Sequence, residues 1–285
     1  MFFSRLISIF MCFFGISYAV DSSPLVLVSV AAYQEVVQEM AGNEIRVQSV
    51  VPAGMSFHTF EPTPGQVVSV CSAKLWFTIG VSFEKMILKA VHGTSTPPDI
   101  IDLRTGLALI HDTVCQCSDG GADTHIWTSP RMMKTQLNTI RDALVAAFPS
   151  QKQGIEARYG GLVQRIDSSI AYADEKLKGS SGKIIVISHG AYDYLCHDYG
   201  IIQRAIEVGG KEAATRSLYA LINEAKERGV KTVFSLKQYP KRGIERVAEA
   251  LGAQVIELDA YQTDYFGGLT YAVDAFHMAL EQERG

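Results

Sequence analysis

The sequence is poor in cysteine, carries no excess of one charge sign, and has no long hydrophobic run after its first residues. Five cysteines among 285 residues are too few for a disulfide framework in a chain of this length. The formal net charge is −4 and no basic run is present, which argues against a surface that binds nucleic acid or an anionic membrane. After the N-terminus, no stretch approaches the ~20 apolar residues of a membrane-spanning helix.

Common catalytic motifs are missing as well. The sequence contains no H-E-x-x-H, H-x-x-E-H or G-x-S-x-G, and "GSSGK" is not a complete P-loop. These absences favour a binding protein over an enzyme. The length, together with a 47% share of hydrophobic residues, is enough for two domains that each have their own core.

The first residues have the pattern of a secretory signal. "MFFSR" is weakly positive through Arg5, "LISIFMCFFGI" is a short apolar run, and "SYA" puts small residues where a signal peptidase reads them. We predict that residues 1–19 are removed and that the mature chain begins at Val20. Large residues precede Cys12, so a lipid anchor is the less favoured alternative.

Four cysteines, Cys71, Cys115, Cys117 and Cys196, would remain in an oxidising compartment. The pair in "VCQCSDGG" is separated by one residue, and a disulfide across so short a span would be strained. Two thiolates there could bind a soft metal, or they could be two ordinary loop thiols. Both interpretations stay open.

Apolar segments alternate with helical patterns through the first half of the chain. Strands are predicted at residues 25–30, 45–51, 75–80 and 97–103, and helices at 32–42, 63–74 and 129–148. The last of these helices has a clear start, with Ser129 as N-cap and Pro130 at its first position. Continuous apolar strands joined by helices are typical of an α/β domain with a parallel sheet.

A long polar segment follows Pro149 and keeps a thin apolar stripe of Ile155, Leu162, Ile166 and Ile170 at helical spacing. We predict one long helix over 149–180 that joins two domains, with a loose linker as the alternative. The strand–helix pattern then restarts, with strands at 183–188, 201–208, 231–236 and 254–259 and helices at 191–200, 214–229, 241–252 and 270–284. The predicted division is a signal peptide at 1–19, an N-terminal α/β lobe at 20–148, the linking helix at 149–180, and a C-terminal α/β lobe at 181–285.

The second half also repeats the first in sequence. "VLVSVAAYQEVVQEMAG" matches "IVISHGAYDYLCHDYG" at one constant offset, and both read as a strand, Ser, two residues, Ala-Tyr and a helix. Such a self-match predicts two related lobes. It isolates one difference, because the first lobe has Val30 where the second has His189. A structural histidine would need no such asymmetry.

Four chemically distinctive residues fall at comparable places in the predicted lobes. His58 follows a strand through a Gly-containing loop, and His125 directly precedes a capped helix, while His189 and Asp259 each end a strand. Ligands of open α/β sheets bind beyond the carboxyl ends of the strands. Because two residues come from each lobe, a shared site would lie in the cleft between them. Three imidazoles and a carboxylate suit a divalent transition metal.

Four segments, "GMSFHTFEPTP", "DTHIWTSP", "ISHGAYDYL" with "YGIIQRAIEVGGKEA", and "VIELDAY", resemble in order and spacing the cluster A-I solute-binding proteins, which deliver zinc or manganese to ABC importers. The resemblance covers essentially all of the mature chain. It implies two α/β lobes joined by one long helix, with the metal between them and His58, His125, His189 and Asp259 as its ligands.

The resemblance also implies the partners and, with the signal pattern, the location. The expected partner is the membrane permease of a metal importer with its cytoplasmic ATPase, and the protein is expected to be a monomer. The expected location is the periplasm, or the outer side of the membrane in a single-membrane cell. A secreted metallohydrolase is the main rival class, although it would need an open coordination position and a general base. An adhesin, which the resembled family includes, is the third.

The choice of metal depends on the ligand set. Zinc members of the family often carry a long His-rich loop before the second ligand motif, whereas "LIHDTVCQCSDGGADTH" has His111 and two cysteines before that ligand. Three imidazoles favour Zn²⁺, and one carboxylate allows tetrahedral closure. If Asp259 binds through both oxygens, five-coordinate Mn²⁺ or Fe²⁺ is the alternative. We expect zinc.

Three further features surround the predicted ligands. Aromatic residues would exclude water from the metal, namely Phe57, Phe60 and Trp127. Glu61 would either orient a ligand imidazole or, as we favour, cap the helix that follows. The paired glycines Gly267 and Gly268 predict a mobile loop after Asp259.

N-terminal sequencing of the mature protein tests the predicted export. The first residue should be at or near Val20, because the small residues before it form the cleavage site. An intact Met1, or a lipid attached to Cys12, would contradict the prediction.

Overall fold

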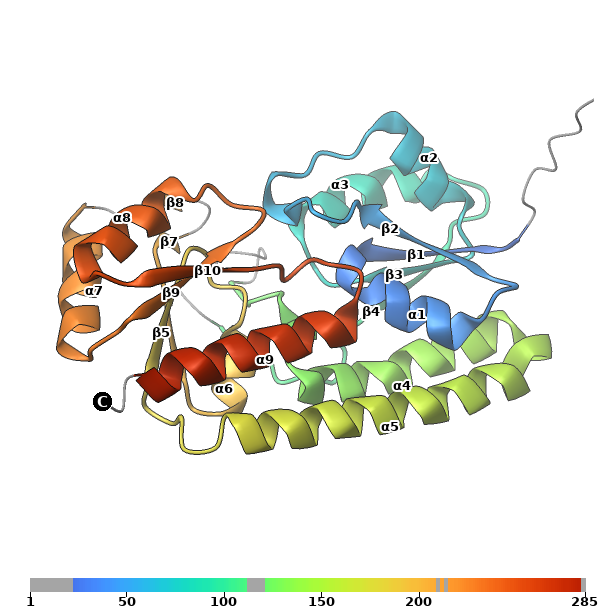
Figure 1. Cartoon of the computed structure of the whole chain (residues 1–285). Helices are drawn as coiled ribbons and strands as arrows, with labels where there is room; N and C mark the ends of the chain where they lie inside the picture. Colours follow the sequence, from blue (N-terminus) through green and yellow to red (C-terminus); the bar gives the residue numbers. More distant parts are fainter. Residues whose placement is uncertain (1–22, 112–120, 209–210, 213–214, 283–285) are drawn as a thin grey trace, which may run out of the picture.

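The computed structural model describes residues 23–111, 121–208, 211–212 and 215–282. The predicted signal segment and the pair Cys115 and Cys117 lie outside these ranges. Among the helices within them, none combines the length and apolar character needed to cross a bilayer. Two lobes stand side by side over a pair of long helices (Figure 1).

The first lobe is built on a four-stranded parallel sheet in the order β2-β1-β3-β4. Its central strand β1 is buried along its whole length, as expected for an apolar strand covered on both faces. The strands are β1 Leu25–Val30, β2 Arg46–Val51, β3 Leu75–Thr78 and β4 Asp99–Asp102, and the helices are α1 Gln34–Ala41, α2 Pro64–Ser72 and α3 Ser82–Val91. The sequence predicts all of these elements except α3.

The second lobe repeats this plan with a parallel sheet in the order β10-β9-β5-β6. Its strands are β5 Ile184–Ile187, β6 Ile202–Ala205, β9 Thr232–Leu236 and β10 Gln254–Leu258, and its helices are α6 Asp193–Asp198, α7 Thr215–Glu227, α8 Arg242–Leu251 and α9 Tyr265–Gln282. A short antiparallel pair, β7 Glu207–Val208 and β8 Lys211–Glu212, follows β6. The predicted fold class of two parallel-sheet α/β lobes is confirmed.

Two helices, α4 Pro130–Ala147 and α5 Lys152–Lys176, run beneath the lobes (Figure 1). The Ser129 side chain accepts a hydrogen bond from Met132 N at 3.1 Å, which is the predicted N-cap. Helix α5 has 25 residues and contacts α4, α1 and α9. A short 3₁₀ turn, Pro149–Gln151, precedes it. The predicted long helix is therefore present, and it packs against both lobes.

The two lobes share one continuous buried core in addition to this helix. The Tyr265 backbone N–H, at the start of α9, donates to Glu35 of α1 at 2.7 Å. Arg165 of α5 pairs with Glu35 and Glu39 and lies over the ring of Phe266, 3.8 Å from its centroid. Polar and apolar contacts together thus hold the lobes in a fixed relation below the cleft.

The structure corrects the prediction of a mobile loop at Gly267 and Gly268. Both glycines lie in the first turn of α9. The Asp264 carboxylate accepts from Gly267 N at 2.9 Å, and a Cβ at Gly267 would lie 2.2 Å from that carboxylate. A Cβ at Gly268 would meet the amide of Gln262 at 1.8 Å. The glycines therefore allow close packing of the turn before α9 and are not a sign of mobility.

The apolar stripe of α5 predicts a large effect of a single truncation. Leu162 is fully buried, so Leu162→Ala should lower the free energy of unfolding by about 2–5 kcal/mol through lost burial and the cavity that remains. Val68 of α2 is 67% exposed, and Val68→Ala should change the free energy of unfolding by about 0.5 kcal/mol or less. Urea denaturation of both variants measures the difference, and equal effects would contradict the packing described here.

Candidate metal centre

Three histidines from both lobes converge in the cleft. One ring nitrogen from each of His58, His125 and His189 lies within 4.8 Å of those of the other two. The ring centroids are 4.7 Å apart for His58 and His189, 5.4 Å for His125 and His189, and 5.6 Å for His58 and His125. Three of the four residues predicted from the sequence are thus neighbours, although they are far apart in the chain.

His58 is positioned by a short 3₁₀ turn, Phe57–Thr59, that follows β2. Ser56 caps this turn, and its hydroxyl oxygen accepts from His58 N at 3.3 Å. The ring of Phe57 packs against the imidazole with centroids 4.1 Å apart. The Ser56 hydroxyl also lies 3.2 Å from the hydroxyl of Tyr239 in the second lobe, so the turn that carries His58 is tied to the opposite side of the cleft.

His125 is fully buried and held by Asp123. The Asp123 carboxylate oxygen Oδ1 lies 2.7 Å from His125 Nδ1 and accepts from His125 N at 2.8 Å. Because a carboxylate only accepts, Nδ1 carries the proton and Nε2 has the lone pair. A carboxylate behind an imidazole fixes its orientation and raises its basicity as a metal ligand. Sequence reasoning missed Asp123, although it lies two residues before His125 in the quoted motif.

His189 follows β5 and is almost fully buried. Among the described residues, neither of its ring nitrogens has a hydrogen-bond partner, and Nδ1 lies 3.8 Å from an oxygen of Glu207. The ring of Tyr239 stacks on the imidazole, with centroids 4.2 Å apart and planes at 12°. Burying polar atoms without partners is unfavourable. The buried ring nitrogens of His189 therefore indicate a site where at least one of them would bind a ligand.

The surroundings keep the imidazoles of His58 and His189 neutral. Burial, and next the charge that His125 would carry, lowers the pKa of His58 to about 3. Burial and the neighbouring histidines also lower the pKa of His189 well below its usual range. A neutral imidazole offers a lone pair, which is the form that binds a metal.

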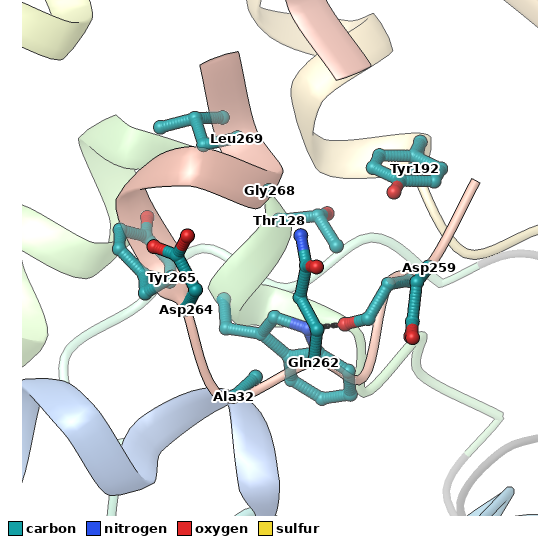
Figure 2. A pocket seen from close by; sticks show the side chains of 11 residues that line it. Ala32, Thr128, Tyr192, Asp259, Gln262, Asp264, Tyr265, Gly268 and Leu269 are labelled. Carbon is teal, nitrogen blue, oxygen red and sulfur yellow. Dashed lines mark hydrogen bonds between the residues drawn. The ribbon is translucent and has the colours of Figure 1, made fainter. Parts of the chain in front are cut away.

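Asp259, the fourth predicted ligand, is not in the group of three histidines. One oxygen of its carboxylate accepts from Gln238 Nε2 at 2.6 Å and from Tyr261 N at 3.0 Å, and the other lies 3.6 Å from Lys237 Nζ. The residue lines a neighbouring cavity together with Gln262 (Figure 2). Ligation by Asp259 stays a prediction, since it requires the carboxylate to leave these partners.

Aromatic side chains enclose the histidines on the first-lobe side. The centroids of Phe57 and Trp127 each lie 5.3 Å from that of His125. Trp127 Nε1 donates to the backbone oxygen of Ala260 in the second lobe at 2.7 Å. Phe60, which the sequence also assigns to this shell, packs on Phe83.

The favoured interpretation of Glu61 as a helix cap is wrong. The cap of α2 is Thr63, whose hydroxyl accepts from Gln66 N at 3.3 Å, while the Gln66 side chain accepts from Thr63 N at 2.9 Å. This reciprocal pair satisfies the first turn of the helix. The other interpretation of Glu61, orienting a ligand imidazole, stays a prediction.

The chain resembles known metal-binding proteins along most of its length. It is 27% identical over 277 residues to a putative metal-binding protein of Chlamydia muridarum. This alignment covers 95% of this chain and 99% of the relative. It is 26% identical to the iron-binding protein YfeA of Yersinia pestis, over 78% of this chain and 72% of that protein. It is 24% identical to the manganese ABC transporter lipoprotein PsaA of Streptococcus anginosus, over 75% of this chain and 72% of that one.

The fold has close counterparts among solved structures. A crystal structure of a ZnuA deletion mutant with zinc bound matches with a TM-score of 0.83 at 26% identity, and the match covers 90% of this chain and 98% of the other. The sequence model of the family described as ZnuA, the periplasmic component A of the zinc-uptake complex, matches residues 26–279. With the two lobes, the long helix and the convergent histidines, this match establishes that the chain belongs to the ZnuA family of metal-binding solute-binding proteins of ABC importers.

Proposed function

We propose that the mature protein captures a divalent transition metal outside the cytoplasm, with Zn²⁺ as the favoured ion, and delivers it to an ABC importer. The observation that carries the proposal is the convergence of three imidazoles from two lobes within 4.8 Å. Low pKa values keep His58 and His189 ready to bind. The metal is the cargo of the protein and is released to the importer.

The proposed ligands are His58, His125, His189 and Asp259. The three histidines already lie together, whereas Asp259 would complete the set after the turn that carries it rearranges. Three nitrogens and one oxygen in a tetrahedral arrangement suit zinc. If Asp259 used both oxygens, the higher coordination number would suit manganese or iron, the metals named for two of the relatives.

The proposal places the protein in the periplasm as a monomer, with the permease and ATPase of a metal importer as partners. It also states that the protein has no hydrolytic activity. A carrier fills the coordination positions of its metal with its own side chains, whereas a metallohydrolase keeps one open for substrate or water. A purified protein that binds one equivalent of metal without hydrolytic turnover would separate the carrier from the enzyme.

Replacing the proposed histidines tests the site. His58→Ala, His125→Ala and His189→Ala should each weaken Zn²⁺ binding by about 100-fold or more, because loss of an outer-shell partner alone costs about 10–100-fold. His197→Ala alters an exposed histidine of α6 and should leave the affinity unchanged. Competition titration of metal-free protein with zinc and with manganese gives both the affinities and the order of preference. Equal affinity in all four variants would refute the site.

The low pKa of His58 predicts how the stability of the metal-free protein depends on pH. The unfolded chain binds a proton at His58 below pH ~6.5, whereas the folded chain does so only near pH 3. The free energy of unfolding should therefore be unaffected by this group above pH ~6.5 and should fall as the pH decreases below it. At pH 5 the contribution is a loss of about 1–2 kcal/mol relative to pH 7.5.

Urea denaturation in the presence of a chelator at these two pH values measures the effect. His58→Gln replaces the titrating ring by a neutral side chain, so its stability should fall less between pH 7.5 and pH 5 than that of the wild type. His197→Gln is the matched control at an exposed site and should keep the wild-type slope. A wild-type slope in His58→Gln would contradict the prediction.

A further inference from the structure

A tyrosine hydroxyl contacts the ring nitrogen of His125 that does not face Asp123. Tyr261 Oη lies 3.0 Å from His125 Nε2 and 3.0 Å from the hydroxyl of Tyr239. Tyr261 is only 2% exposed and belongs to the second lobe, whereas His125 belongs to the first. Since Asp123 holds the proton of His125 on Nδ1, Nε2 accepts and the Tyr261 hydroxyl donates.

The same nitrogen is the one that His125 would offer to a metal. An unprotonated imidazole nitrogen has one lone pair in the ring plane, which accepts one hydrogen bond or binds one metal ion. Nδ1 is not available, because it carries the proton shared with the Asp123 carboxylate. The Tyr261 hydroxyl and a metal ion therefore exclude each other at Nε2.

We propose that Tyr261 occupies the His125 ligand position in the metal-free protein, and that metal capture displaces its hydroxyl from Nε2. This inference rests on the proposed function and specifies a residue that sets the affinity of the same site. In the metal-free state the hydroxyl donates to this buried nitrogen, and the hydrogen bond stabilises that state relative to the metal-bound one.

The position of Tyr261 in the chain connects this exchange to Asp259. The Asp259 carboxylate holds the backbone N–H of Tyr261 at 3.0 Å, so both residues lie on one turn after β10. A cavity of about 30 Å³, lined by Asp259 and Gln262, lies beside this turn and gives room for a small shift (Figure 2). A rearrangement of this turn that withdraws the hydroxyl from His125 can also release the Asp259 carboxylate from Tyr261 N, which holds it together with Gln238 and Lys237. One movement can thus remove the competing group and supply the fourth ligand.

In the metal-free protein, the Tyr261 hydroxyl is part of a series of hydrogen bonds that links the two lobes. Ser56 of the first lobe contacts Tyr239 of the second at 3.2 Å, Tyr239 contacts Tyr261, and Tyr261 contacts His125 of the first lobe. The series crosses the cleft twice, so the metal-free lobes are joined at the site by protein groups alone. Displacement of Tyr261 replaces one of these crossings by a metal-mediated contact.

Tyr261→Phe in the mature, metal-stripped protein tests the inference. The variant keeps the ring and removes the hydroxyl, so it should bind Zn²⁺ about two- to tenfold more tightly, the effect of losing one competing neutral hydrogen bond. Its metal-free form should melt at a lower temperature than the wild type, and saturating zinc should raise its melting temperature by more. Competition with a chromophoric chelator and thermal unfolding give the two readings.

Tyr33→Phe is the matched control, because Tyr33 is another buried tyrosine of the core, and its hydroxyl accepts from Gln136 at 2.8 Å. It should lower the stability without changing the affinity for zinc. Unchanged affinity in Tyr261→Phe would overturn the inference, and weaker binding would do so as well, since that result would mean that the phenol oxygen is a ligand. If the wild-type protein binds neither zinc nor manganese, the proposed function fails too, whereas normal wild-type binding confines the failure to Tyr261.

Discussion

Packing between the two lobes is the constraint on which the histidine group depends. His58 and His125 belong to the first lobe and His189 to the second, so their ring nitrogens meet only if the lobes keep a fixed distance. The bond from Trp127 to the backbone of Ala260 sets that distance beside the site. The shared core and the ion pairs of Arg165 set it further below. Metal affinity is therefore a property of the whole interface as much as of its ligands.

The three histidines differ in the residues that contact them and in how deeply they are buried. His125 is fixed from behind by a carboxylate, His189 is covered by a stacked tyrosine, and His58 is carried on a short turn with a partly exposed ring. The histidine with a carboxylate partner is thus fully buried, whereas His58, the one nearest to solvent, lies on a short 3₁₀ turn. An ion entering from outside would meet His58 before it meets the buried pair.

The sequence predicts the strands well because burial on both faces makes them continuously apolar, as in the segments that became β1 and β5. It also predicts His58 and His189, because both follow strands of parallel sheets and because Val30 and His189 differ between otherwise similar lobes. His125, which precedes a helix, is predicted from the motif "DTHIWTSP". It does not predict the contacts of Asp259, which are made by Gln238 on a neighbouring turn and by Tyr261 on the same turn. Tyr239 and Tyr261 were missed for the same reason, since nothing local distinguishes a tyrosine that reaches across an interface.

Two local patterns were misleading, and the physical reasons are instructive. Glycine permits both mobility and close contact, so Gly267 and Gly268 gave no basis for choosing between a loop and a tightly packed helical turn. An acidic residue near a helix start is compatible with a cap, but Thr63 and Gln66 form the reciprocal pair that α2 uses. In both cases residues nearby in the sequence decided the outcome: Thr63 and Gln66 form the cap, and Gln262 and Asp264 pack against the two glycines.

The single long helix that links the lobes has a consequence for what an importer can recognise. With 25 residues, α5 is roughly 38 Å long, and its buried stripe is packed along most of that length. Bending it would break backbone hydrogen bonds and expose apolar surface together, so large swings of one lobe are unfavourable. The outlines of the empty and loaded proteins should then be nearly the same. Any partner that distinguishes the two forms would then have little more than small local differences to recognise, and the empty protein would compete with the loaded one for it.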